Sequence, residues 1–212
     1  MSHYREKFKE LKPSEVSYSV HDKTLIIREN NFPVDNPKLA FIEVMQEFYE
    51  KNTYETLKTG TRIHIDTIIG DNVALGCNCT IGGFGFGYER TEGSLVRIPH
   101  HGHVVIEDGV TIHNNVNIDR AVKDATIIGK GSAIDSHCHI GHNARIGHNV
   151  LIAANSTIGG SAVIGNNVFI GCNSFVKQKI KIGEGAIIGA GSVVLKDVPS
   201  GETWVGNPAK KI

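Results

Sequence analysis

Aliphatic residues recur at every sixth position along most of the chain, and this periodicity is the strongest structural signal in the sequence. A small or β-branched residue follows each of these anchors by four positions, as Cys138 follows Ile134. A period of six is a multiple of the strand period but not of the helical period of about 3.6, so the anchors cannot share one face of an α-helix. The pattern therefore predicts short strands. The longest unbroken series occupies positions 128, 134, 140, 146, 152, 158, 164, 170, 176, 182, 188 and 194.

Glycine, asparagine and aspartate recur between the anchors and supply corner residues that tolerate unusual backbone dihedrals. Three six-residue sides would close a triangular coil, and stacked coils would pair strand on strand at about 4.8 Å. The same register holds in two shorter blocks, at positions 63, 69, 75 and 81 and at positions 106, 112 and 118. Together these anchors predict a mainly β protein, a parallel β-helix of about six coils.

Two interruptions of the repeat and two flanking segments set the predicted domain organisation. We expect a small α/β N-terminal domain at 1–58, a β-helix at 59–198 with a loop insertion at 82–103, and a C-terminal tail at 199–212. A shorter break falls at 119–127. In the N-terminal part, Asn36 before a proline predicts a helix start, followed by an apolar stripe of Leu39, Ile42, Met45 and Tyr49. This domain would cap the open end of the coils or contact substrate, and both roles are compatible.

Charge and cysteine content exclude several classes of function. Twenty-two basic residues cancel 22 acidic ones, so no overall field attracts nucleic acid or an anionic membrane. Apolar runs are short, and the first residues carry charges where a signal peptide needs an apolar segment. We therefore expect a cytoplasmic protein without stable membrane insertion or nucleic-acid binding, and with reduced cysteines.

Histidines raise the question of a metal site. His137, Cys138, His139, His142 and His148 lie close in sequence. The hexad register, however, places His142 and His148 on neighbouring sides of the coil and turns Cys138 inward. We therefore expect no metal site within one subunit, and we expect most histidines other than His142 to be solvated.

The string around His142 resembles a known enzyme family. Ile140-Gly-His-Asn143 is similar to the aliphatic–Ala/Gly–His–Asn motif of the UDP-3-O-acylglucosamine N-acyltransferases of lipid A synthesis. The resemblance extends over roughly residues 32–176 and implies that the β-helix is left-handed. Further matches are Asn36-Pro-Lys-Leu-Ala-Phe41, Ile81-Gly-Gly-Phe-Gly-Phe-Gly-Tyr88, Arg97-Ile-Pro99 and Asn117-Ile-Asp-Arg120.

The resemblance implies a catalytic role for His142 as general base, since a neutral imidazole can take a proton from an attacking amine. It also implies that the Gly160 backbone N–H stabilises the oxyanion. Asp135 would orient the imidazole or contact substrate. Arg120, which the register places on the coil beside His142, would favour the neutral imidazole. For Asp135 and Arg120, hydrogen-bonded pairing between coils is an equal alternative.

The resemblance also implies substrate contacts and a homotrimer with sites between the subunits. Aromatic residues of the long interruption would stack on a base or sugar, or pack on a neighbouring subunit. The expected substrate-binding residues are Phe84, Phe86, Tyr88, Arg97, Asp119, Arg120 and Asn143.

Two departures from that family bear on the acyl donor. The N-terminal part is shorter than the family's uridine-binding domain, and Lys179 stands where the family has a second histidine. The ending Val205-Gly-Asn-Pro-Ala-Lys-Lys-Ile212 resembles that of acetyl-CoA-dependent sugar acetyltransferases. The residues expected to contact CoA phosphates are Lys179, Lys196, Lys210 and Lys211.

These observations favour an acyl-CoA-dependent N-acyltransferase that acylates the amine of a nucleotide-linked amino sugar and holds no bound cofactor. Transfer from acyl carrier protein in a lipid A-like pathway is the alternative within this class. The alternatives outside the acyltransferases are a non-catalytic scaffold and a metalloenzyme similar to the γ-carbonic anhydrases.

Overall fold

The computed structural model describes residues 16–19, 22–27, 30–49 and 54–212, with side chains described only to residue 45 in the helix. Its contacts divide the chain into two compact units, 1–51 with 87–101 and 52–86 with 102–212. The tip of the long interruption therefore belongs to the same unit as the N-terminal part. The charged residues at the start of the chain lie outside the described residues.

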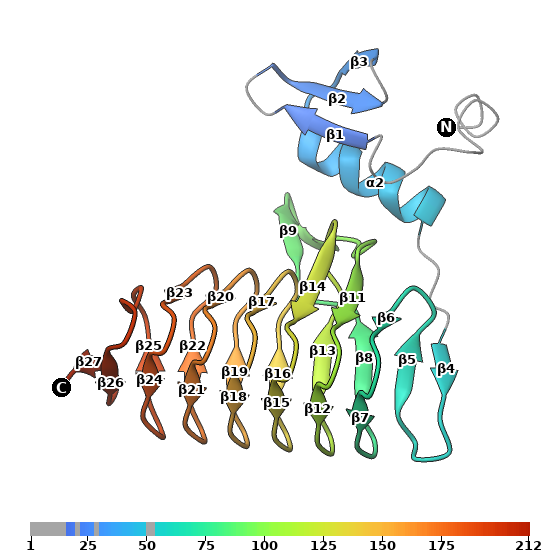
Figure 1. The fold of residues 1–212 in the computed structure, drawn as a ribbon. Helices are drawn as coiled ribbons and strands as arrows, with labels where there is room; N and C mark the ends of the chain where they lie inside the picture. Colours follow the sequence, from blue (N-terminus) through green and yellow to red (C-terminus); the bar gives the residue numbers. More distant parts are fainter. Residues whose placement is uncertain (1–15, 20–21, 28–29, 50–53) are drawn as a thin grey trace. The chain divides into compact units, whose positions relative to one another are not determined.

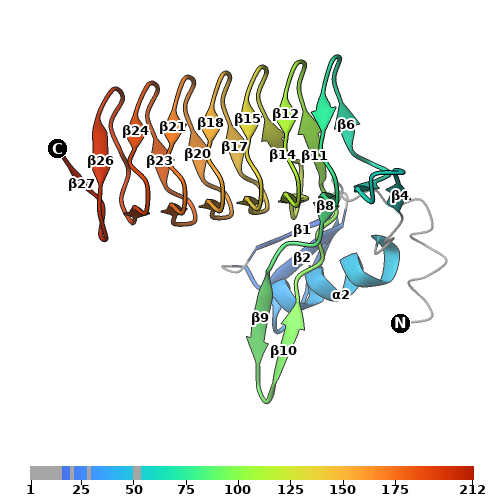
Figure 2. The ribbon, with the colours of Figure 1, turned by 90° about the horizontal axis from the view of Figure 1, so that it is seen from below.

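The second unit is a solenoid of short strands joined by tight corners (Figures 1 and 2). Its strands are β4 (Tyr54–Thr56), β5 (Arg62–His64), β6 (Ile68–Ile69), β7 (Ala74–Leu75), β8 (Thr80–Gly83), β11 (His103–Ile106), β12 (Thr111–Ile112), β13 (Asn117–Asp119), β14 (Ala125–Ile128), β15 (Ala133–Ile134), β16 (His139–Ile140), β17 (Arg145–Ile146), β18 (Leu151–Ile152), β19 (Thr157–Ile158), β20 (Val163–Ile164), β21 (Phe169–Ile170), β22 (Phe175–Val176), β23 (Lys181–Ile182), β24 (Ile187–Ile188), β25 (Val193–Val194), β26 (Thr203–Val205) and β27 (Lys210–Lys211).

Every third strand pairs in parallel, so the solenoid has three flat faces. Face 1 has the order β23-β20-β17-β14-β11-β6, face 2 runs β27-β26-β24-β21-β18-β15-β12-β7, and face 3 runs β25-β22-β19-β16-β13-β8-β5-β4. Anchors lie beside anchors, as Ile140 beside Ile158 and Ile158 beside Val176. Among the described residues this gives six complete coils, from β6–β8 to β23–β25, as the periodicity predicts.

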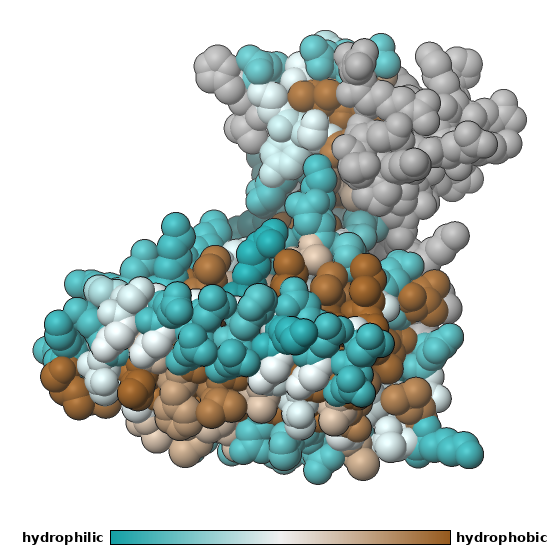
Figure 3. Space-filling view, viewed as in Figure 1, coloured by the Kyte–Doolittle hydropathy of each residue, from teal (hydrophilic) through white to brown (hydrophobic). Residues whose placement is uncertain are grey.

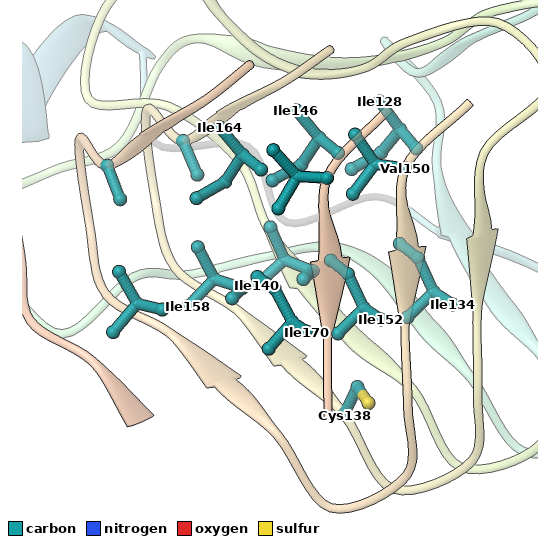
Figure 4. Packing of buried hydrophobic residues seen from close by; sticks show 14 of the residues in the cluster. Ile128, Ile134, Cys138, Ile140, Ile146, Val150, Ile152, Ile158, Ile164 and Ile170 are labelled. Atoms are coloured by element: carbon teal, nitrogen blue, oxygen red, sulfur yellow. The ribbon is translucent and has the colours of Figure 1, made fainter. Parts of the chain in front are cut away.

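The anchors fill the interior of the coils (Figure 4). Ile134, Ile140 and Ile158 have no exposed surface, and Cys138 is 1% exposed at the other inward position. Burial of an aliphatic side chain contributes about 1.5–3 kcal/mol, and stacking repeats this gain in each coil. Ile69 is an exception at 39% exposed, because β6 is the edge strand of face 1 and no further strand covers it.

Corners between the faces depend on residues that adopt the left-handed backbone region. Asparagine occupies it repeatedly, for example Asn143 at φ 60° and Asn155 at φ 58°. Side chains then tie one coil to the next: the Cys77 N–H donates to Asn114 Oδ1 (2.8 Å), and the His148 N–H donates to Asn166 Oδ1 (2.9 Å). The polar residues between anchors therefore satisfy backbone groups that the short strands leave unpaired.

The first unit contains an antiparallel sheet, β1 (Val16–Ser19), β2 (Thr24–Ile27) and β3 (Asn30–Pro33), and the helix α2 (Pro37–Tyr49). Asn36 caps the helix as predicted, since its Oδ1 accepts the Leu39 N–H at 3.1 Å. Ile42 and Met45 are buried, whereas the side chain of Tyr49 lies outside the described residues. The hairpin of β9 (Tyr88–Thr91) and β10 (Ser94–Arg97) belongs to this unit, and Lys38 forms an ion pair with Glu89.

The C-terminal residues extend face 2. Strand β26 pairs in parallel with β24, and β27 pairs antiparallel with β26. Residues 203–211 of the expected tail thus continue the sheet. Within the described ranges, no helix is long and apolar enough to cross a membrane.

Candidate functional site

His142 lies at the corner that follows β16, with its ring against Gly160 of the next coil. A methyl group at Gly160 would lie 2.7 Å from His142 Nε2, nearer than atoms can approach, so glycine leaves the space that the ring occupies. On the other side, Nδ1 lies 3.2 Å from Asn143 Oδ1. The two catalytic candidates His142 and Gly160 are therefore in direct contact.

The Asn143 side chain holds the segment of the short interruption in place and sets the tautomer of His142. Its Nδ2 donates to the Lys123 carbonyl (2.9 Å), and its Oδ1 accepts the Val122 N–H (2.9 Å). The amide oxygen must therefore face His142, whose Nδ1 can approach it only as a donor. Nε2 then carries the lone pair, which makes it the basic nitrogen of the ring. Both ends of the Asn143 amide are hydrogen-bonded within the chain. Substrate contact by Asn143 stays a prediction.

The Gly160 N–H is a corner donor without a hydrogen-bond acceptor among the described residues, as are the N–H groups of Ala154 and Cys172, and it is the one that lies beside the His142 ring. At the matching corner position the Cys77 and His148 N–H groups donate to asparagine side chains of the next coil, whereas the residue beyond Gly160 is Gln178. In the described part of the chain, no hydrogen bond uses the Gly160 N–H. This donor beside His142 can therefore bind an oxygen that bears developing negative charge.

A carboxylate and a second imidazole lie next to His142. Asp119 is only 8% exposed, and its Oδ2 lies 3.5 Å from Nε2 of His139, the first residue of β16. Burial raises the pKa of Asp119 to about 7. Burial, and then the positive charge that His142 can carry, lower the pKa of His139. Asp119 and His139 thus form a pair in which burial shifts both pKa values, and the charge of His142 acts on His139.

Arg120 is buried in packing between coils. Its guanidinium carbon lies 4.1 Å from the centroid of the Phe84 ring, and Nη1 contacts Nε2 of buried His64. The strand register shifts between Ile118 and Asp119, so a count from Ile118 does not fix where Arg120 points. These contacts agree with the alternative of pairing between coils. An influence of Arg120 on His142 stays a prediction.

The remaining residues expected to bind substrate differ in exposure. Phe84 is half-buried beneath the Arg120 guanidinium, whereas Phe86 is 87% exposed. In the hairpin, Tyr88 on β9 lies opposite Arg97 on β10, and Tyr88 is exposed. Of the three aromatic residues, Phe86 therefore presents the most surface for stacking.

Asp135 lies at a different corner, between faces 2 and 3. Its Oδ1 accepts the Ser136 N–H (2.7 Å) and lies 3.7 Å from His113 Nδ1. It cannot orient His142 of its own chain from that corner. Asp135 also lines a shallow groove of about 160 Å³ with His113, Ala133, Leu151, Ile152, Ala153 and Phe169.

The lysines expected to contact CoA lie in two different places. Lys196 occupies the same position as His142, Gly160 and Gln178 in the last complete coil. The Lys179 N–H donates to the Gly160 carbonyl (3.0 Å), which places its exposed side chain at this corner too. Lys210 and Lys211 belong to β27 on face 2, where Lys211 Nζ lies 2.7 Å from Glu202 Oε1.

Histidines other than His142 differ in burial. His113, His137 and His148 are exposed, His139 is partly exposed, and His64 and His100 are buried. His139 was missed as a candidate. The strand register, which places Asn117 beside His139 and hence Asp119 nearby, was the signal that could have revealed it. Among the described residues, no group of three or more histidine, cysteine or acidic side chains is arranged to hold a metal ion.

Comparison with known proteins identifies the repeat and relates the chain to acyltransferases. Residues 125–160 and 161–196 match the bacterial transferase hexapeptide family (six repeats), and residues 66–85 match the hexapeptide repeat of succinyl-transferase. A UDP-3-O-acylglucosamine N-acyltransferase from Caulobacter vibrioides is 50% identical over 145 residues, which cover 68% of this chain and 43% of the relative. The chain thus spans less than half the length of that relative.

Solved structures share the fold. LpxA from Acinetobacter baumannii matches with a TM-score of 0.56 at 23% identity, over 74% of this chain and 73% of that one. LpxA from Bacteroides fragilis, a UDP-N-acetylglucosamine acyltransferase, matches with a TM-score of 0.63 at 22% identity, over 72% and 58% of the two chains. The parallel β-helix expected from the repeat and the left-handedness implied by the resemblance are both confirmed.

Proposed function

We propose that this chain, whose residues 125–196 match the bacterial transferase hexapeptide family and whose residues 66–85 match the hexapeptide repeat of succinyl-transferase, transfers an acyl group from a thioester to the amine of a nucleotide-linked amino sugar. The contact of His142 with Gly160 is the observation that carries the proposal. The name of the Caulobacter relative, an N-acyltransferase of UDP-3-O-acylglucosamine, supports an amine acceptor on a nucleotide sugar.

In the proposed mechanism His142 Nε2 takes a proton from the nitrogen as it attacks the thioester carbonyl. The Nδ1 contact with Asn143 Oδ1 supports this assignment, because it keeps Nε2 unprotonated in the neutral ring. The Gly160 N–H then donates to the oxyanion of the tetrahedral intermediate. Collapse of the intermediate releases the thiolate, which receives the proton from His142.

We propose acyl-CoA as the donor. Lys196 and Lys179 support this choice, since both lie at the corner of His142 and Gly160. Lys196 lies about 14 Å from His142 along the stack, three coil spacings of about 4.8 Å, within reach of a phosphate on an extended CoA. Acyl carrier protein is the second candidate, favoured by the likeness to a relative whose named substrate already carries an acyl group. Either donor, with a nucleotide sugar, suits a cytoplasmic enzyme.

We propose a homotrimer with sites between the subunits. Its support is a stripe of exposed apolar side chains on face 2, Leu151, Phe169 and Ile187, which pair in register on β18, β21 and β24. Brown residues gather along the lower margin of the solenoid in Figure 3, where these strands lie in Figure 1. A second copy would cover this stripe, and its Asp135 would then be available to a site that its own His142 cannot share.

Thiol release from acyl-CoA or acyl-acyl carrier protein, measured against a panel of nucleotide amino sugars that includes UDP-3-O-acylglucosamine, tests the proposal. We expect release that depends on the acceptor and is lost in His142→Ala. His137→Asn is the matched control, because His137 is an exposed corner histidine whose φ of 61° suits asparagine. Activity with acyl carrier protein alone would overturn the CoA assignment, and a scaffold would release no thiol.

A further inference from the structure

We propose that Asp119 and His139 form a second base beside His142, which removes from an ammonium acceptor the proton it must lose before its nitrogen can attack. The inference rests on the proposed function, since an amine is the acceptor that arrives with this additional proton. Both residues lie outside the pair of His142 and Gly160 that the mechanism above uses.

The positions of Asp119 and His139 give the two residues distinct roles. They come from adjacent strands of face 3, β13 and β16, and Asp119 Oδ2 lies 3.5 Å from His139 Nε2. The His139 side chain is 43% exposed and the Asp119 side chain 11%. His139 is therefore the member that a substrate can reach, and the buried carboxylate faces its Nε2. Nδ1, the ring nitrogen that does not face the carboxylate, is left to accept a proton from an ammonium acceptor.

The charges around the pair suit a group that gains and loses a proton near neutral pH. Burial raises the pKa of the carboxyl to about 7 and lowers that of the imidazole, so the carboxyl is the member of the pair that titrates near neutral pH. Directly after β13 the neighbouring charge is Arg120, whose guanidinium lies over Phe84, and on β19 the neighbour is Thr157. Beyond β16 the facing titratable group is His142, whose positive charge acts on His139.

The proton balance of amide formation requires such an acceptor. An ammonium ion and a thioester give an amide, a thiol and one free proton. Of the three protons on the ammonium nitrogen, one stays in the amide, and one passes through His142 to the sulfur of the leaving thiolate. The third must leave before attack, because a protonated nitrogen has no lone pair. Asp119 and His139 would take that proton and release it to water.

The test compares two acceptors that differ in this proton. One is UDP-3-O-acylglucosamine, and the other is its analogue with NHOH in place of the amine, which is unprotonated at pH 7. In Asp119→Asn and His139→Gln we expect kcat/KM for the amine at pH 7 to fall about 10- to 100-fold, the lower part of the range for a general base. The analogue should lose less than about twofold. Near pH 9 the defect with the amine should shrink, because amines with a pKa of about 8 are then mostly neutral in solution.

Three results would count against the inference, and they are distinguishable. Equal losses with both acceptors would indicate a structural role, which thermal unfolding of the variants would reveal independently. An unchanged kcat/KM for the amine at pH 7 in both variants would also overturn it. In either case acylation of the amine by the wild-type protein would leave the proposed function intact. Acylation of hydroxyl groups alone by the wild-type protein would overturn both.

Discussion

Gly160→Ala is expected to separate activity from stability. The added methyl carbon would lie 2.7 Å from His142 Nε2, 3.0 Å from Cε1 and 3.1 Å from Cδ2. Ordinary contact begins near 3.4 Å, so the ring must move by several tenths of an ångström to about 1 Å. A displacement of about 1 Å at a reacting group can lower the rate about 100-fold. We therefore expect kcat to fall about 100-fold.

Stability should change little in the same variant. The backbone of Gly160 lies outside the left-handed region, so alanine is compatible with it, and the contacts closest to the new methyl group are with one side chain. Replacing glycine at a compatible position typically stabilises a protein by about 0.4–1 kcal/mol through the unfolded state. We expect the midpoint of thermal unfolding to stay within about 3 °C of the wild-type value.

Initial rates of thiol release and calorimetry on the same preparation measure the two effects. Gly165→Ala is the control for backbone damage, because its methyl carbon would lie 2.6 Å from the Glu184 backbone nitrogen, at a corner without His142, and should lower the unfolding midpoint. The double variant Gly160→Ala, His142→Ala should be no slower than His142→Ala, since both changes act on one group. A kcat within twofold of the wild type in Gly160→Ala would refute this reasoning.

Three further predictions concern the hydrogen bonds of the Asn143 side chain, the core and the buried Asp119 carboxyl. Asn143→Gly removes the bonds to the 120–124 segment and should lower both kcat and the free energy of unfolding, the latter by about 2 kcal/mol in urea titration. Ile158→Ala, at a fully buried anchor, should cost about 2–5 kcal/mol in the same assay, whereas Val163→Ala, 38% exposed, should cost less than about 0.5. The pKa of Asp119 rises from 3.8 unfolded to about 7 folded, so the folded state binds more protons between these values and stability from this group is lost as pH rises. Relative to Asp119→Asn, the wild-type protein should therefore lose a few kcal/mol between pH 4 and pH 8, and an unchanged difference in unfolding free energy would contradict this.

The fold was predictable because its signal is repeated. Every coil has the same inward positions. The neighbouring units therefore show that Leu75 and Val176, which replace isoleucine at the anchor position, also point inward. The site was less predictable, because its geometry arises where the repeat breaks. The contact between His142 and Gly160 follows from the register alone, since they lie one coil apart.

Other contacts depend on how the interruptions pack. Asp119 lies at the register shift with its Oδ2 3.5 Å from His139 Nε2, and the same irregularity accompanies the packing of Arg120 on Phe84. No periodicity contains that information. Burial of His64 was likewise hidden, because a count of positions does not show its contact with the Arg120 guanidinium.

The nature of the bond formed tests the central claim most directly. Wild-type protein is incubated with acyl-CoA and the nucleotide amino sugar that it accepts, and the product is examined by mass spectrometry before and after mild alkali. We predict one added acyl group that survives alkali as an amide, and its loss in His142→Ala but not in His137→Asn. An alkali-labile ester, or an amide formed by His142→Ala at the wild-type rate, would contradict the account.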